Sequence, residues 1–355
     1  MIELGHGNLL EADVEALVNT VNCVGIMGKG IALQFKQAFP DNFKAYQSAC
    51  KKGEVCPGTM FIFPTKKLLN PKYIINFPTK RHWKQPSKLE DIETGLVALI
   101  EEVQKLEIRS IAIPPLGCGN GGLRWEEVKP LITKSFSKLP AVKVVIFEPA
   151  GAPLPEKMPI GTEKPSLTRP RALLIRLLEL YGIPGYELTL LEIQKLAYFL
   201  QAAGEPLKLR FEKQKFGPYA HNLNHVLQLL EGHFIRGYGD HAAVDKEVHT
   251  LPGASDAATA LLADMPEALE RLERVSKLIR GFETPYGMEL LATVHWLATH
   301  EDLDAAENFE RAIKGVQSWS ERKSGLFRDA HIKTAWIQLQ EQGWLHRTNT
   351  AVGSV

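Results

Sequence analysis

A glycine-rich segment near residue 120 constrains the fold more than any other feature of this 355-residue chain. The run Pro114-Pro115-Leu116-Gly117-Cys118-Gly119-Asn120-Gly121-Gly122-Leu123 follows an apolar stretch at 109–115 and precedes a helical pattern that begins near Arg124. This order predicts a buried strand, a tight turn and a helix. Glycines let the backbone of such a turn approach a phosphate closely, and the N-terminus of the following helix adds a partial positive charge. The segment therefore predicts a phosphate-binding turn.

Two other phosphate-binding motifs match this segment less well. Gly117, Gly119 and Gly122 have the G-x-G-x-x-G spacing of a dinucleotide-binding turn, but that turn follows the first strand and has an acidic residue about 20 positions later. Residues 142–145 are Val-Lys-Val-Val, without an acid. A Walker loop is excluded because no Gly-Lys-Ser/Thr follows the glycines. A structural turn without a ligand remains the alternative.

Apolar runs alternate with helical patterns through residues 1–155. Strands are expected near 14–20, 58–64, 72–77, 109–115 and 142–148, and helices near 29–38, 41–50, 88–107 and 124–137. This alternation predicts a three-layer α/β/α domain.

The second half of the chain has a different character. Prolines and glycines are frequent in the stretch before residue 169, which predicts a linker at 156–168. From 169 to 355 helical periodicity predominates, with helices expected at 171–180, 188–203, 221–232, 256–280, 286–298 and 305–316. The sequence therefore predicts a separate, mainly helical domain.

Several segments of the first half resemble the macro domain, the module that binds ADP-ribose. They are Gly7-Asn8-Leu9-Leu10, Ala16-Leu17-Val18-Asn19-Thr20-Val21-Asn22, Gly28-Lys29-Gly30-Ile31-Ala32 and the turn at 113–123. The segment Asn76-Phe77-Pro78-Thr79-Lys80-Arg81-His82-Trp83 is similar to the subgroup that includes the DarG antitoxins and the terminal ADP-ribose protein glycohydrolases. The resemblance implies a macro domain with a mixed sheet, in which a lysine carries the chemistry.

This resemblance implies an ADP-ribose site with Lys80 and Asn22 as catalytic residues. Adenine would lie near Asn8 and Leu9, the diphosphate against 117–122, and the distal ribose beside Asn22. The contacts expected from the matched motifs are Asn8, Leu9, Val21, Asn22, Gly28, Lys29, Gly30, Thr79, Gly117, Cys118, Gly119, Asn120, Gly121, Gly122 and Leu123. Many macro domains have Gly-Asp where this chain has Gly7-Asn8; the amide keeps an acceptor for adenine but loses the charge. No metal and no cofactor is expected.

The resemblance further implies hydrolysis of the N-glycosidic bond between ADP-ribose and thymidine in single-stranded DNA. Lys80 could protonate the leaving group as an ammonium, or attack C1″ as an amine whose pKa is lowered by Lys29, Arg81 and partial burial. Three alternatives remain open: a reader that binds ADP-ribose without cleaving it, a glycohydrolase of ADP-ribosylated protein carboxylates, and a Lys80 that only pairs with a phosphate.

Basic and aromatic residues are interleaved between positions 66 and 88. The cations are Lys66, Lys67, Lys72, Lys80, Arg81, Lys84 and Lys88, with no acid among them. Cations can bind phosphates, and flat rings can stack on unpaired bases, so Arg81, His82, Trp83 and Lys84 are expected to bind single-stranded nucleic acid. A solvated loop is the alternative.

Two features of the second half suggest a protein partner. Ile193-Gln194-Lys195-Leu196-Ala197-Tyr198-Phe199-Leu200, with Phe211-Glu212 and Lys215-Phe216-Gly217-Pro218-Tyr219, resembles the Panacea-type antitoxin domain, which implies binding and inhibition of a DarT-like DNA ADP-ribosyltransferase toxin. Acids also cluster, at Asp240, Asp245, Glu247, Asp256, Asp264, Glu267 and Glu270, and at Glu301, Asp302, Asp304, Glu307 and Glu310. They form either solvated helix faces or a surface that imitates DNA phosphates.

Composition narrows the class of protein. The chain has no uninterrupted apolar run of about 18 residues and no signal-peptide pattern, so a cytoplasmic protein without a membrane partner is expected. Its length suggests two domains. Cys23, Cys50, Cys56 and Cys118 lack metal-like spacing and are expected to be reduced thiols. Cys23 and Cys118, which lie in the two ligand segments, are expected to pack as small apolar side chains.

Overall fold

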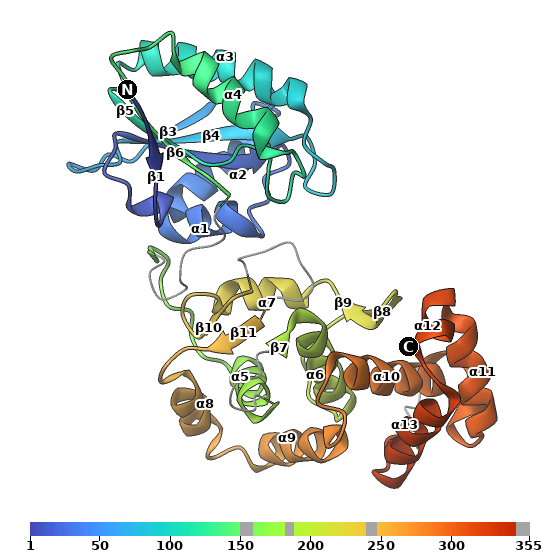
Figure 1. Cartoon of the computed structure of the whole chain (residues 1–355). Helices are drawn as coiled ribbons and strands as arrows, with labels where there is room; N and C mark the ends of the chain where they lie inside the picture. Colours follow the sequence, from blue (N-terminus) through green and yellow to red (C-terminus); the bar gives the residue numbers. More distant parts are fainter. Residues whose placement is uncertain (150–158, 182–187, 239–246, 346–355) are drawn as a thin grey trace. The chain divides into compact units, whose positions relative to one another are not determined.

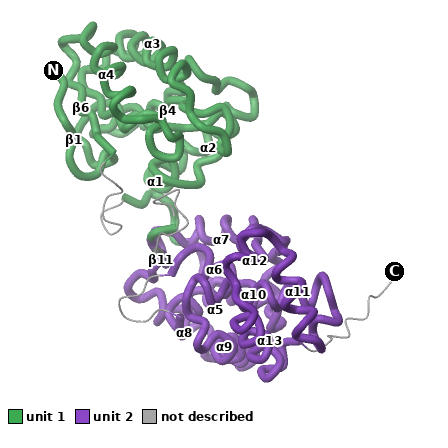
Figure 2. The backbone as a smooth tube through the Cα atoms, turned by 45° about the vertical axis from the view of Figure 1, so that its right-hand side comes forward, with its two compact units in different colours: residues 1–164, 237–243 green, residues 165–236, 244–355 purple. Residues whose placement is uncertain are grey.

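A computed structural model describes residues 1–149, 159–181, 188–238 and 247–345. Two compact units share these residues (Figure 2). Unit 1 contains Met1–Lys164 and a short segment from Gly237, and unit 2 contains Pro165–Arg236 and the chain from Val244. Of the linker expected at 156–168, residues 156–158 lie outside the described residues.

Unit 1 is built on a six-stranded sheet with the order β1-β6-β5-β2-β4-β3. Its strands are β1 (Ile2–Gly5), β2 (Ala16–Asn22), β3 (Phe61–Pro64), β4 (Tyr73–Lys80), β5 (Ser110–Ile113) and β6 (Lys143–Phe147). All neighbouring pairs are parallel except β3–β4, which is antiparallel. The expected mixed sheet is therefore confirmed.

Helices cover both faces of this sheet (Figure 1). The helices α3 (Leu89–Lys105) and α4 (Trp125–Phe136) pack on one face, where Val18 and Phe77 lie in the same buried cluster as Leu96 and Ile132. The helix α1 (Gly30–Ala38) packs on the other face, where Phe35 joins a cluster with residues of β2 and β4, and α2 (Pro40–Lys51) follows it. The three-layer α/β/α architecture is thereby confirmed.

Unit 2 is mostly helical, as expected. Its α-helices are α5 (Arg169–Tyr181), α6 (Leu190–Ala202), α7 (Leu223–Leu230), α8 (Ala254–Leu262), α9 (Pro266–Ile279), α10 (Pro285–Trp296), α11 (Phe309–Trp319), α12 (Glu321–Leu326) and α13 (Asp329–Glu341). Short strands accompany them: β7 (Leu188–Thr189), β10 (Ile235–Arg236) and β11 (Glu247–Thr250) form one small sheet, and β8 (Phe211–Gln214) pairs with β9 (Gly217–Ala220).

One expectation for secondary structure was wrong, and several short strands were not expected. The helix expected at 256–280 is two helices, because Pro266 cannot continue α8 and instead occupies the first turn of α9. The segment Lys215-Phe216-Gly217-Pro218-Tyr219 belongs to the β8–β9 hairpin, where Gly217 has a positive φ of 91°. The edge strand β1 was not expected at all.

No helix within the described parts of the chain combines the length and apolar character that crossing a membrane requires. In the same residues, no group of three or more His, Cys, Asp or Glu side chains is placed to hold a metal ion.

Candidate active site

Three loops meet at the carboxyl edge of the central strands of unit 1. The strands β5, β2 and β4 are adjacent and parallel, so the segments that follow them leave the sheet at the same edge. The segment after β2 leads into α1, that after β4 leads into α3, and that after β5 leads into α4. Because α1 and α3 lie on opposite faces, a crevice is expected at this edge, where α/β sheets bind ligands.

An irregularity in the β2–β4 pairing brings Lys80 beside Asn22. The residues pair in step up to Val21 and Pro78, and the register then shifts so that Asn22 is the partner of Lys80. Thr79 is the extra residue, and its hydroxyl donates to the carbonyl of Val21 at 3.4 Å. A one-residue insertion changes the direction of every later side chain in a strand. The bulge therefore decides which side chain of β4 accompanies Asn22.

The Lys80 ammonium is anchored on the glycine-rich turn. Its Nζ donates to the carbonyl of Asn120, so the end of β4 and the turn after β5 are in direct contact. Burial lowers the pKa of Lys80, since the charged form loses solvation. Arg81, expected to contribute to this shift, forms an ion pair with Asp91 at 3.1 Å instead. A lysine whose ammonium is partly desolvated gives up its proton more readily than a solvated one, which suits both roles expected for it.

The side chain of Asn22 organises the loop that follows β2. Its Oδ1 accepts from the backbone N–H groups of Val24 at 3.0 Å and Ile26 at 3.3 Å, while its Nδ2 donates to the carbonyl of Ile26. The hydroxyl of Tyr46 on α2 donates to the backbone carbonyl of Asn22. These contacts fix the loop beside Lys80. The contact of Asn22 with a ribose stays a prediction.

The turn after β5 has the form expected of a phosphate-binding loop. Its own hydrogen bonds use the N–H groups of Cys118, Gly122 and Leu123. Those of Gly119, Asn120 and Gly121 donate to no acceptor in the described part of the protein. Successive N–H groups of this kind ahead of a helix N-terminus are suited to binding an anion, and phosphate binding at this turn stays a prediction.

The glycines of this turn differ in whether space or backbone conformation restricts a side chain at each position. A Cβ on Gly121 would lie 2.1 Å from the carbonyl oxygen of Gly117, so packing inside the turn forbids a side chain there. Gly122 has a φ of 80°, which favours glycine. Gly119 has neither restriction, since no atom lies within 4 Å of its added Cβ. Open space beside Gly119 is what close approach of a ligand requires.

The start of α1 completes this edge of the crevice. Gly30 has a φ of 58°, and a Cβ there would lie 3.2 Å from Nδ2 of Asn120. Lys29 is the exposed N-cap residue of α1 and Gly28 is half-buried. The expected contact residues Gly28, Lys29 and Gly30 thus lie next to the turn.

Asn8 and Leu9 lie farther along the same edge. They follow β1, three strand positions from β2, a separation of about 14 Å at the usual strand spacing. Asn8 is buried and its Oδ1 accepts from the N–H of Leu10 at 3.0 Å, which caps a short 3₁₀ helix at Leu9–Glu11. The contact of Asn8 with adenine stays a prediction.

The loop between β4 and α3 carries a small exposed aromatic platform. The rings of His82 and Trp83 stack at 5.6 Å, and Nζ of Lys84 lies 5.0 Å from the centre of the Trp83 ring. Trp83 is 45% exposed. Arg81 pairs with Asp91 but keeps 62% of its side chain exposed, so it lies accessible beside His82, Trp83 and Lys84.

The basic stretch at 66–88 does not form one surface. Lys66, Lys67 and Lys72 belong to the β3–β4 connection, at the amino end of β4, whereas Lys80 lies at its carboxyl end. Lys72 pairs with Glu15 at 2.8 Å. An eight-residue strand therefore separates these lysines from the residues expected to bind nucleic acid, Arg81 to Lys84.

The cysteines near the crevice have the properties of apolar side chains. Burial raises the pKa of both Cys23 and Cys118 to about 11, which keeps the thiols protonated near neutral pH. The thiol of Cys23 donates to the carbonyl of Lys80 at 3.3 Å. Cys118 thus contributes to the turn through its backbone.

Sequence reasoning missed two residues at this edge, Tyr46 and Ser87. Tyr46 is fully buried and contacts Asn22, and Ser87 is buried against Gly121, to whose carbonyl its N–H donates at 2.9 Å. Neither belongs to a recognisable motif. Only the spatial proximity of α2 and of the β4–α3 loop to the turn identifies them.

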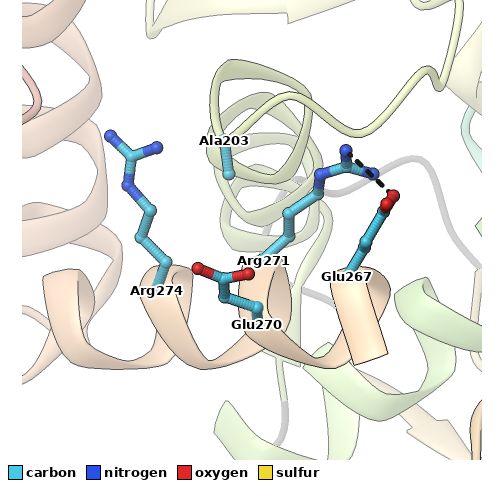
Figure 3. Close-up of a pocket in the computed structure, with 5 residues that line it drawn as sticks. All are labelled: Ala203, Glu267, Glu270, Arg271 and Arg274. Carbon is cyan, nitrogen blue, oxygen red and sulfur yellow. Dashed lines mark ion pairs between the residues drawn. The ribbon is translucent and has the colours of Figure 1, made fainter. Parts of the chain in front are cut away.

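Unit 2 contains a shallow pocket of about 170 Å³, lined by Ala203, Glu267, Glu270, Arg271 and Arg274 (Figure 3). Glu267 and Arg271 form an ion pair at 3.8 Å, and Arg271 also contacts the buried Glu205 at 2.8 Å. Two acids and two arginines line it, so neither sign of charge predominates and no ligand class is indicated.

Cations already neutralise part of the acidic surface of unit 2. Glu301 pairs with Lys213 at 2.6 Å, and Arg311 pairs with Asp302 at 2.8 Å and Asp304 at 3.3 Å. Among the described acids of the two clusters noted in the sequence, those exposed without an ion pair are Asp256, Asp264, Glu270, Glu307 and Glu310. Asp240 and Asp245 lie outside the described residues, and the side chain of Glu247 is not described.

The fold of unit 1 defines the class of protein: unit 1 is a macro domain, and the macro domain family model matches residues 18–132. Over 345 residues the chain is 50% identical to a DNA ADP-ribosyl glycohydrolase of Thermus aquaticus, covering 97% of this chain and 94% of that protein. The chain belongs to the DNA ADP-ribosyl glycohydrolase family, which confirms the macro-domain resemblance and the expectation of a glycohydrolase.

Two further similarities concern parts of the chain. A fusion of a DNA ADP-ribosyl transferase with a DNA ADP-ribosyl glycohydrolase from Thermosipho africanus is 35% identical over 170 residues, which cover 44% of each chain. The solved macrodomain of Mycobacterium tuberculosis DarG is 58% identical, with a TM-score of 0.42, and the match covers 42% of this chain and 99% of that one.

Proposed function

We propose that unit 1 hydrolyses the N-glycosidic bond between ADP-ribose and thymidine in single-stranded DNA, with Lys80 as the essential residue. One observation carries this proposal: the partly desolvated ammonium of Lys80 contacts the same turn whose free N–H groups form an anion site. A diphosphate bound to that turn would hold the attached ribose next to Lys80. The name of the Thermus aquaticus relative supports DNA-linked ADP-ribose as the substrate.

In the proposed reaction the bond between C1″ of the ribose and the thymine nitrogen breaks, and water supplies hydroxide to C1″ and a proton to the base. The diphosphate binds the N–H groups of Gly119, Asn120 and Gly121. Adenine binds at Asn8 and Leu9, and Asn22 orients the distal ribose. Positive charge develops on the ribose ring and negative charge on the departing base, so the site must supply a proton or a nucleophile.

Lys80 can meet this need in two ways. As an ammonium it protonates the departing base, and water then adds to C1″. As a neutral amine it displaces the base from C1″, forms an imine with the opened sugar, and releases ADP-ribose on hydrolysis. Borohydride separates these routes, because reduction of an imine attaches ADP-ribose permanently to Lys80, whereas general-acid catalysis leaves no adduct.

The DNA strand would extend from the crevice over the aromatic platform. Trp83 and His82 offer ring faces to an unpaired base, and Lys84 offers a cation to a phosphate. Stacking on these rings requires an unpaired base, which favours single-stranded substrates.

We further propose that unit 2 binds and inhibits a DNA ADP-ribosyltransferase toxin. The Thermosipho africanus fusion protein, which joins the two activities in one chain, supports this pairing. DNA mimicry by unit 2 would depend on its exposed acids without ion pairs, since Arg311 and Lys213 neutralise their neighbours.

The direct test of unit 1 compares three substrates with the full-length protein. Release of ADP-ribose is followed by mass spectrometry from a thymidine-modified single strand, from the same strand annealed to its complement, and from a peptide modified on a glutamate. The proposal predicts fastest release from the single strand. Preference for the peptide would favour the protein-carboxylate alternative, and binding of ADP-ribose without any release would leave a reader.

For unit 2, the test is inhibition of the purified toxin by the Lys80→Ala protein, which cannot reverse the modification. Undiminished inhibition supports a separate binding function. The charge at Glu307 and Glu310 is then reversed in the same Lys80→Ala protein. If inhibition of the toxin stays unchanged, DNA mimicry through those two acids is excluded.

A further inference from the structure

Ser87 lies where the loop after β4, residues 81–88, meets the glycine-rich turn after β5, and its hydroxyl has no hydrogen-bond partner among the described residues. The residue is 7% exposed. Its Oγ is buried without a donor or acceptor among the described residues. Buried hydroxyls are usually hydrogen-bonded, so an exception in a binding site calls for an explanation.

The hydroxyl is directed at the glycine-rich turn. A Cβ added to Gly121 would lie 2.2 Å from Oγ of Ser87 and 2.1 Å from the carbonyl oxygen of Gly117. Both oxygens are thus within 2.2 Å of one point, and a small movement of the turn would bring them into hydrogen-bond distance. The Gly117 carbonyl accepts from the N–H of Leu123 at 3.1 Å and has a second lone pair available.

Two consecutive carbonyls of the same turn accept hydrogen bonds from the end of β4 and from the loop that follows it. Nζ of Lys80 donates to the carbonyl of Asn120, and the N–H of Ser87 donates to the carbonyl of Gly121 at 2.9 Å. A shift of the turn toward Ser87 therefore also changes the position of the Asn120 carbonyl relative to Lys80. Ser87 is thus linked through the turn to the carbonyl that Lys80 contacts.

We propose that Ser87 is a positioning residue whose hydroxyl bonds to the Gly117 carbonyl only when a diphosphate occupies the turn. In the ligand-free protein the unpartnered hydroxyl disfavours the structure. In the bound protein the new hydrogen bond holds the turn closed on the diphosphate, with Lys80 aligned to the attached ribose. This inference rests on the proposed binding of ADP-ribose at the turn.

The consequence is that stability and affinity respond to Ser87 in opposite directions. Removing the hydroxyl relieves a buried unsatisfied group in the free protein, so the melting temperature should stay the same or rise. It also removes a hydrogen bond from the bound state, so the dissociation constant for ADP-ribose should increase about fivefold, the value of one ordinary hydrogen bond. Loss of a purely structural residue would lower both the melting temperature and the affinity for ADP-ribose.

The experiment measures Ser87→Ala, with Ser137→Ala as the matched control. Ser137 is an exposed serine at the end of α4 whose hydroxyl donates to Lys134. Calorimetry with ADP-ribose and with adenosine, which lacks phosphates, separates the turn from the rest of the crevice. We expect about fivefold weaker ADP-ribose binding, unchanged adenosine binding, and an unchanged or higher melting temperature for Ser87→Ala alone.

Unchanged ADP-ribose affinity, or equal losses for both ligands, would overturn the role of Ser87. A lower melting temperature for Ser87→Ala would also overturn this role. Ser87→Cys, whose side chain has a similar shape but donates weakly, then shows whether the lower melting temperature comes from lost packing. Failure of the wild-type protein to bind ADP-ribose would instead refute the proposed function itself, so the two failures are distinguishable.

Discussion

Alanine substitution at two glycines of the turn should have different effects: a loss of stability at Gly121 and a loss of ADP-ribose affinity at Gly119. At Gly121 an added Cβ meets the Gly117 carbonyl at 2.1 Å and Oγ of Ser87 at 2.2 Å, contacts that force the turn to move. Overpacking of this kind costs about 1–3 kcal/mol. For a domain of this size each kcal/mol lowers the melting temperature by about 2–4 °C. Gly121→Ala should therefore melt several degrees lower.

Gly119→Ala should leave stability almost unchanged, because nothing lies within 4 Å of the new methyl group and φ is not positive there. Surface changes of this kind shift stability by about 0.5 kcal/mol or less. If the space beside Gly119 holds the diphosphate, however, the methyl group enters it, and ADP-ribose affinity should fall about tenfold or more, since 1.4 kcal/mol corresponds to tenfold.

Thermal unfolding and calorimetric titration with ADP-ribose test both variants on the full-length protein. A stable Gly119→Ala protein that binds ADP-ribose as tightly as the wild type would refute the assignment of the diphosphate to this turn. An undisturbed melting temperature for Gly121→Ala would refute the packing described for the turn.

Two further predictions concern the aromatic platform and the core of unit 2. Trp83→Ala should weaken binding of single-stranded DNA by about 1–3 kcal/mol, the value of one stacked base, without changing the affinity for free ADP-ribose; fluorescence anisotropy with a labelled oligonucleotide measures the first, and an equal loss for both ligands would contradict stacking. In unit 2, burial lowers the pKa of Lys195 from about 10.5 to about 7, while its Nζ donates to the carbonyl of Pro218 at 2.7 Å. At a pH between these two pKa values, Lys195 is protonated in the unfolded chain and neutral in the folded protein. The free energy of unfolding should therefore rise by about 3 kcal/mol from pH 7 to 9.5. Urea unfolding of Lys195→Met should lack most of this rise, and the same pH dependence in both proteins would show that Lys195 is not its source.

The sequence indicated the turn because its glycines are a local signal. Gly117 and Gly122 have positive φ values of 72° and 80°, and such backbone requirements are visible in the residue types themselves. The helices and inner strands of unit 1 were likewise predictable from apolar periodicity. The four-residue strand β1 was not, since only its pairing with β6 identifies it as a strand.

Other parts of the site depend on contacts between distant segments. The register shift at Thr79, which makes Lys80 the partner of Asn22, arises from the pairing of two strands 57 positions apart at Asn19 and Asn76. The ion pair of Arg81 with Asp91 and the position of Ser87 depend on how α3 begins. Pro266 is a local signal for the start of a helix, but the apolar periodicity on both sides of it favoured a single helix at 256–280.

The most direct test of the central claim is release of ADP-ribose from a thymidine-modified single-stranded oligonucleotide by the full-length protein and by Lys80→Ala. Removing an essential acid or nucleophile should reduce the rate by at least about 100-fold. ADP-ribose affinity should change little, because in the ligand-free protein Lys80 Nζ contacts the Asn120 carbonyl. Rapid release by the wild type and none by a variant that still binds ADP-ribose is the predicted result. Equal release by both proteins would contradict the role of Lys80, and no release by either would contradict hydrolysis of this substrate.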